Sequence, residues 1–173
     1  LFRSNLDPSG MSLWPASAGT ARMNGLQQLL QLDSGLALVQ AANQSRKDAL
    51  ALNSMLSGSS ATLNTVFPGT SIGQQLLQVA KIIKLRGSTG MARQVFFCSL
   101  GGFDTHGSQS WQHWDLLNDL SQAMLAFYNT TIELGIPDKV TQFTLSDFGR
   151  SLQPSGSGSD HGWGNHHMIL RSE

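Results

Sequence analysis

Apolar residues in the middle of the chain recur with the spacing of amphipathic helices. The clearest pattern follows Thr70, where one helical face collects Ile72, Leu76, Val79, Ala80 and Ile83. Thr70 or Ser71 can cap the start of this helix, and Gly87 is expected to end it. Basic residues in its last turns suit the negative end of the helix dipole. The pattern therefore predicts a helix that buries its apolar face.

Two other segments show helical spacing. One spans residues 25–56, and the other spans residues 113–133, after which Pro137 prevents the helix from continuing. Residues 1 to about 24 instead mix Pro, Gly and Ser with isolated apolar residues, which predicts a surface loop or an ordered insertion.

Two short apolar runs, at residues 94–100 and 140–145, are rich in residues that favour strands. Neither run alternates with polar residues, so each is expected to be a strand covered on both faces. A strand, a long helix and a second strand form a βαβ unit, whose crossover makes the strands parallel and is nearly always right-handed. The sequence therefore predicts an α/β fold for residues 94–146.

The composition excludes several classes of protein. The chain has 173 residues, 40% of them hydrophobic, with 11 basic residues balancing 11 acidic ones. This balance gives no electrostatic case for binding nucleic acid or an anionic membrane surface, and no apolar run reaches the roughly 18 residues of a membrane span. The single cysteine, Cys98, lies in an apolar run and is expected to be a buried, inert thiol. Both ends resemble cuts, so we expect a fragment of a larger protein.

Polar side chains follow both predicted strands, at residues 101–107, 146–150 and 160–167. Ligands of open α/β sheets bind where parallel strands end along one edge. We expect one cleft to hold four of these side chains, namely Asp104, His106, Asp147 and His161. Of the other histidines, His113 is expected on a solvated helix face, whereas the pair 166–167 suits either a metal ligand or a strand edge.

Asp104 and His106 are two residues apart, so in an extended segment both side chains leave the same face. A carboxylate and an imidazole that converge in this way can hold a divalent cation such as zinc. The alternative is that the Asp orients the His or caps the following helix. Asp160 and His161 form a similar pair near glycines that permit close backbone approach. Arg150 can bind an oxyanion, although an arginine after a strand is also a common salt-bridge partner.

Four motifs occur in the order GGFDTHGSQ, HWDLLNDL, SDFGR and GSDHGWGNHH. Together with IGQQLLQVAKII and RQVFFCSL, they resemble the bacterial domain-of-unknown-function 1501 family over about residues 34–170. That family is usually placed near the alkaline phosphatase and sulfatase superfamily. The resemblance implies that residues 34–173 form part of an alkaline-phosphatase-like α/β domain with parallel strands and crossover helices, truncated at both ends. Residues 1–33 would then be a loop or insertion region.

The superfamily hydrolyses phosphate and sulfate esters at two metal ions, which implies a set of metal ligands here. By motif position the ligands would be Asp104, His106, Asp147, Asp160 and His161, with Arg150 near the departing anion. Phe148 stands where the superfamily has a histidine, and Asp147 replaces the glutamate more frequent in SEFGR. The Asp-to-His spacing of two is tighter than usual, and the Ser or Thr nucleophile belongs to an N-terminal part of the fold that this fragment lacks.

Three functions compete at this point. The first is a metal-dependent hydrolase of phosphate or sulfate esters, located in the periplasm or otherwise outside the cytoplasm as the family resemblance implies. In that case the full-length parent would be active and the isolated fragment inactive. The second is a non-catalytic protein that uses the same site to bind an envelope polymer or to assemble with a partner. The third is a truncated product without a function of its own.

Overall fold

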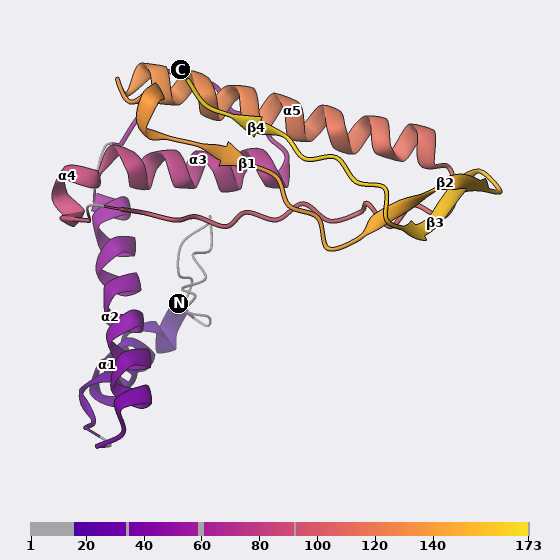
Figure 1. Cartoon of the computed structure of the whole chain (residues 1–173). Coiled ribbons are helices and arrows are strands. Elements are labelled where there is room, and N and C mark those ends of the chain that lie inside the picture. The colour runs from indigo at the N-terminus through magenta and orange to yellow at the C-terminus, as the bar shows by residue number, and fades with distance from the viewer. Residues whose placement is uncertain (1–15, 34, 59–60, 92, 173) are drawn as a thin grey trace. The chain divides into compact units, whose positions relative to one another are not determined.

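The structure is a computed structural model, and it describes residues 16–33, 35–58, 61–91 and 93–172. The chain divides into two compact units, Leu1–Ala61 and Thr62–Glu173. Figure 1 shows the elements of both units in chain order. The first two α-helices contact each other and lie together in the first unit, and the boundary predicted near residue 33 stays a prediction.

The first unit is helical. A 3-10 turn, Ala16–Ala18, leads into α1 (Gly19–Gln31), which contacts α2 (Ala37–Gly58). The loop alternative for residues 1–24 is therefore wrong from residue 16 onward, whereas the ordered insertion stays a prediction, and residues 1–15 lie outside the described part of the chain. The reason is propensity, because Ala, Met, Leu and Gln in this stretch favour helix more than its isolated glycines oppose it.

Helix α3 (Ser71–Lys84) is the first helix of the second unit, and it confirms the helix that the apolar pattern predicts. Thr70 caps it, since its Oγ1 accepts a hydrogen bond of 3.3 Å from the backbone N–H of Gly73. The stop predicted at Gly87 is wrong. The chain continues through a one-turn helix, α4 (Arg86–Thr89), which ends at Gly90 in the left-handed conformation that glycine adopts readily.

Helix α5 (Gln109–Glu133) lies beside α3 (Figure 1), and the two helices provide most of the core. The buried residues of this core are Phe67, Val79, Ala80, Ile83, Ala126, Phe127 and Ile136. Cys98 packs against them, and burial raises the pKa of its thiol, which supports the expected inert role. A 3-10 turn, Pro137–Lys139, follows α5. None of the helices in the described residues combines the length and apolarity needed to cross a bilayer.

The strands form two antiparallel pairs. Strand β1 (Gln142–Phe143) pairs with β4 (Ile169–Leu170), and β2 (Gly149–Ser155) pairs with β3 (Gly158–Gly162). The mixed helix and strand character expected from the sequence is confirmed, but both pairings described are antiparallel rather than parallel.

Residues 94–100 are the main departure from the predicted fold. They form no strand, and Val95 and Phe97 are 87% and 71% exposed. A parallel strand needs a neighbouring strand to satisfy its backbone, and none pairs with this segment in the described residues. Instead, the side-chain amide of Gln75 on α3 bonds both the N–H and the C=O of Ser99, each at 2.9 Å. The prediction of a buried parallel strand here is wrong because a strand depends on its partner.

Glu133, the last residue of α5, supports a pH prediction. Its carboxylate accepts hydrogen bonds from the backbone of Asn64 and from the backbone and hydroxyl of Thr65, at 2.7–2.9 Å. The bond from the Asn64 backbone is the largest cause that lowers the pKa of Glu133. The stabilisation is therefore present above the unfolded pKa, near 4.3, and is lost as the pH falls through the folded value.

We accordingly expect Glu133→Gln to lower the free energy of unfolding at pH 7, because glutamine keeps an acceptor but loses the charge. The difference from wild type should shrink as the pH is lowered from 6 to 3, which urea unfolding at several pH values would measure. A difference that stays constant over this range would contradict the role assigned to the ionised carboxylate.

Candidate metal centre

Asp104 and His106 lie in the segment that leads into α5. Their side chains share one side, as the spacing predicts, and His106 Nε2 lies 2.8 Å from Asp104 Oδ1. Thr105, between them, turns the other way and is only 2% exposed. Burial of the middle residue anchors the segment and leaves its two neighbours directed outward.

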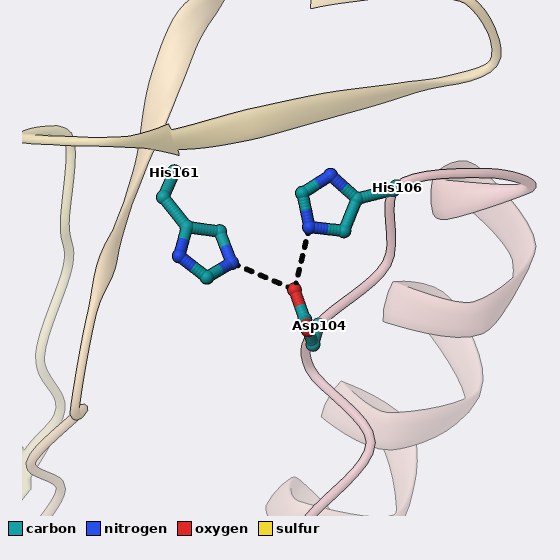
Figure 2. A group of neighbouring side chains, drawn as sticks. All are labelled: Asp104, His106 and His161. Atoms are coloured by element: carbon teal, nitrogen blue, oxygen red, sulfur yellow. Dashed lines mark hydrogen bonds and ion pairs between the residues drawn. The ribbon is translucent and has the colours of Figure 1, made fainter.

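The β2–β3 hairpin brings His161 to the same place. In the hairpin, His161 stands opposite Arg150, and its Nε2 lies 2.7 Å from Asp104 Oδ1. Figure 2 shows this carboxylate oxygen between the two imidazole rings, each joined to it by a dashed line. Asp160 adds a second carboxylate, with its Oδ1 at 3.2 Å from Nδ1 of His106. One histidine therefore contacts two carboxylates, and one carboxylate contacts two histidines.

Stacked rings hold His161 in place. The Phe148 ring lies 4.3 Å from the His161 ring at an interplanar angle of 9°, and the His106 ring stacks on His161 at 5.1 Å. The guanidinium carbon of Arg150 lies 5.3 Å from the centre of the Phe148 ring. From the sequence, Phe148 was notable only because it stands where the superfamily has a histidine. Its contact with His161 was not predicted.

The hairpin approaches the Asp104 segment closely because its turn and β3 carry small residues. A Cβ at Gly158 would lie 2.5 Å from the carbonyl carbon and oxygen of His106, so only glycine fits there without a shift. Ser157, in the turn, accepts a hydrogen bond from the N–H of Ser108 at its hydroxyl and one from the N–H of Gln109 at its carbonyl. These contacts fasten the hairpin to the start of α5.

Arg150 is the most enclosed charged residue near the cluster, with a side chain that is 14% exposed. Its Nη1 donates to the carbonyl of Ser159, and its Nη2 donates to the carbonyl of Phe103 at 2.5 Å and to Thr105 Oγ1 at 3.3 Å. Its Nε is buried and has no hydrogen-bond partner among the described residues. Most of the donors that could bind an oxyanion are therefore already used within the chain.

The cluster keeps Asp104 ionised. The hydrogen bond from His161 is the largest cause that lowers the pKa of this carboxyl. Burial opposes it as the second-largest cause, and the charges of His106 and His161 lower the pKa further. An ionised carboxylate at neutral pH is what metal ligation requires.

Asp104, His106 and His161 together fit a divalent cation. Each offers one ligand atom, and these atoms lie within 4.8 Å of one another. Zinc bonds to nitrogen and oxygen are about 2.0–2.2 Å, so ligands around a tetrahedral ion lie roughly 3.3–3.5 Å apart. The carboxylate oxygen is now 2.7 and 2.8 Å from the two nitrogens, so it would need to move outward by about half an ångström. Side-chain exposures of 62% for Asp104 and 51% for each histidine leave room for that movement.

The other candidates lie outside this group. Asp147 is exposed, lies in a bend before β2, and makes no hydrogen bond or ion pair among the described residues. Its predicted role as a ligand stays a prediction. His113 is partly buried, against the expectation of a solvated face, because its ring packs edge-on against Phe103. The adjacent pair 166–167 is exposed.

The sequence anticipated that Asp104, His106 and His161 meet, but not the reason. The convergence was expected at a shared edge of parallel strands, whereas an antiparallel hairpin produces it. A signal for the hairpin was present in the Ser155–Gly158 stretch, since two residues including glycine between strand-like runs favour a tight turn. Gly156 occupies this turn with a φ of 60°.

Comparison with known proteins places the chain in a family. No curated protein and no solved structure gives a match. The sequence profile of a family described as protein of unknown function, DUF1501, matches residues 15–170, which is most of the chain. The protein therefore belongs to the DUF1501 family.

Proposed function

We propose that the chain contributes a divalent-metal centre, with zinc as the first candidate, to a metal-dependent hydrolase of phosphate or sulfate esters that acts outside the cytoplasm. The supporting observation is the convergence of Asp104, His106 and His161, whose ligand atoms lie within 4.8 Å. Two imidazoles and one carboxylate form a donor set that suits zinc, and three protein ligands leave a coordination position open, as in catalytic zinc sites.

Each residue of the cluster has a separate task in this proposal. Asp104 supplies the negative charge, and the two Nε2 atoms supply neutral nitrogen ligands once they no longer hydrogen-bond to Asp104. Asp160 accepts a hydrogen bond from Nδ1 of His106, which directs Nε2 toward the ion, as outer carboxylates do in other metal sites. A bound divalent ion would polarise an ester oxygen and lower the pKa of an attacking group. The nucleophile is proposed to come from another part of the full-length protein.

Metal binding by the chain itself tests the centre. We expect His106→Ala to weaken zinc binding by more than about 100-fold, since even the loss of outer-shell partners costs about 10–100-fold. His167→Ala is the matched control, because that histidine is exposed and lies outside the cluster, and its zinc affinity should equal that of wild type. Competition with a chromophoric chelator would give both affinities. Equal zinc affinity in wild type and the His106 variant, both folded by circular dichroism, would reject the centre.

The proposed hydrolysis is tested in the full-length parent that the sequence leads us to expect. Its hydrolysis of aryl phosphate and aryl sulfate esters should fall together with its zinc content in the His106→Ala variant. If zinc content falls in the variant but neither wild type nor the variant hydrolyses an ester, the proposed hydrolase is rejected and the metal centre is retained.

The exposure of the cluster favours a second candidate. The side chains of Asp104, His106, His161 and Asp160 are 51–68% exposed, so a large anionic polymer could reach a bound ion. In this alternative the parent binds an envelope polymer or partner without catalysis. Metal-dependent retention of an anionic polymer by a parent that shows no hydrolysis would support it.

A further inference from the structure

The guanidinium of Arg150 lies between the two segments that carry the proposed ligands. On one side it bonds the carbonyl of Phe103 and the hydroxyl of Thr105, the two residues that flank Asp104. On the other side it bonds the carbonyl of Ser159, two residues before His161 in β3. One planar side chain therefore joins the Asp104 segment to the strand of His161.

The backbone of Arg150 adds to this connection. Its N–H donates to the carbonyl of Gly164 at 2.7 Å, and the N–H of Gly164 donates back at 2.9 Å. His161 therefore lies between two points, Ser159 and Gly164, that both bond to Arg150. Arg150 Nη2 also lies 3.7 Å from Asp104 Oδ1, which places a fixed positive charge beside the shared carboxylate.

We infer that Arg150 is the positioning residue of the metal centre: it sets the separation between the Asp104 segment and the His161 strand and does not bind the anion of a substrate. This inference rests on the proposed metal centre. A mostly enclosed guanidinium whose donors point at three oxygens of two segments suits this task, because a rigid fork holds several acceptors at once. Lysine has a single ammonium head and would keep the charge without holding both segments.

The first test compares Arg150→Lys with wild type in the full chain, using zinc and cobalt alone as probes. We expect zinc affinity to fall by about 10–100-fold, as for other outer-shell contacts, and the visible absorption bands of bound cobalt to change. Arg171→Lys is the matched control, since the Arg171 side chain is exposed and, among the described residues, bonds only the carbonyl of the adjacent Ser172. Its zinc affinity and cobalt spectrum should equal those of wild type.

A double-mutant cycle separates positioning from general damage to the fold. If Arg150 acts by holding His161 in place, Arg150→Lys should cost little further zinc affinity once His161→Ala has removed that ligand, so the two losses are less than additive. Thr105→Val gives a milder second variant, because it removes one acceptor of the guanidinium and keeps a similar volume. It should lower zinc affinity a few-fold, and only while His161 is present.

The outcomes distinguish this inference from the function on which it rests. A wild-type chain that binds no zinc would reject both. A wild-type chain that binds zinc with the same affinity as Arg150→Lys would reject the positioning role alone, as would fully additive losses in the cycle. Unchanged zinc affinity with weaker binding of inorganic phosphate would assign Arg150 to the anion instead. If Arg150→Lys does not fold, the same cycle is measured with Thr105→Val and His161→Ala. A loss of zinc affinity from Thr105→Val that is the same with and without His161 would then reject the positioning role.

Discussion

Asp104→Asn is expected to reduce zinc binding by more than about 100-fold, because even outer-shell losses cost about 10–100-fold in metal sites. The Asp104 Oδ1 atom lies 2.7 Å from one imidazole nitrogen and 2.8 Å from another, so this one atom joins both histidine ligands. Asparagine keeps the shape but removes the charge that an ion needs. Competition titration and metal analysis of the purified variant would measure the loss.

Asp138→Asn is the matched control for Asp104→Asn. It makes the same chemical change at an exposed carboxylate in the turn after α5, outside the cluster. Its zinc affinity should equal that of wild type. Retention of wild-type zinc binding by Asp104→Asn would show that the carboxylate is no ligand and that its contacts with the histidines are only ion pairs.

Gly158→Ala should weaken both the fold and the metal centre. The added Cβ would lie 2.5 Å from the His106 carbonyl and 2.7 Å from the Thr105 carbonyl, and backbone atoms cannot move aside as a flexible side chain can. The hairpin must therefore shift away from the segment of Asp104 and His106, which takes His161 with it. We expect the free energy of unfolding to fall by about 1–3 kcal/mol, as for other overpacked sites, and zinc affinity to fall in parallel.

Gly101→Ala provides the control for Gly158→Ala. A Cβ at Gly101 meets nothing within 4 Å, and its backbone is not in the left-handed region. Its stability should stay within about 0.5 kcal/mol of wild type, as for most surface changes. Urea unfolding of both variants would measure the difference, and a Gly158→Ala protein as stable as wild type would contradict the close approach of the hairpin.

Features that depend on neighbours in sequence were predictable here. The cap at Thr70 and the apolar face of α3 follow from residues within four positions of one another. The shared side of Asp104 and His106 likewise follows from a spacing of two in an extended segment. In these cases the local backbone decides the outcome.

Features that depend on a distant partner were not predictable. The apolar run at 94–100 has the composition of a strand, but composition does not supply a neighbouring strand. Asp147 and His161 were equal candidates from residue type alone. The hairpin register places His161 beside Asp104, whereas Asp147 precedes the paired residues. A pairing register is a non-local property, and a single sequence specifies it only where a turn reveals it.

The two-residue turn between β2 and β3 makes chain length as important to the centre as residue identity. With Ser155 opposite Gly158, the turn begins the pairing of β2 with β3, and a register shift between Arg150 and Pro154 then sets His161 across from Arg150. Because side chains alternate along a strand, a register slip of one residue would turn His161 to the opposite face and leave every residue of the cluster present. A relative with all of these residues and one extra residue in the turn would therefore keep the motif and lose the geometry.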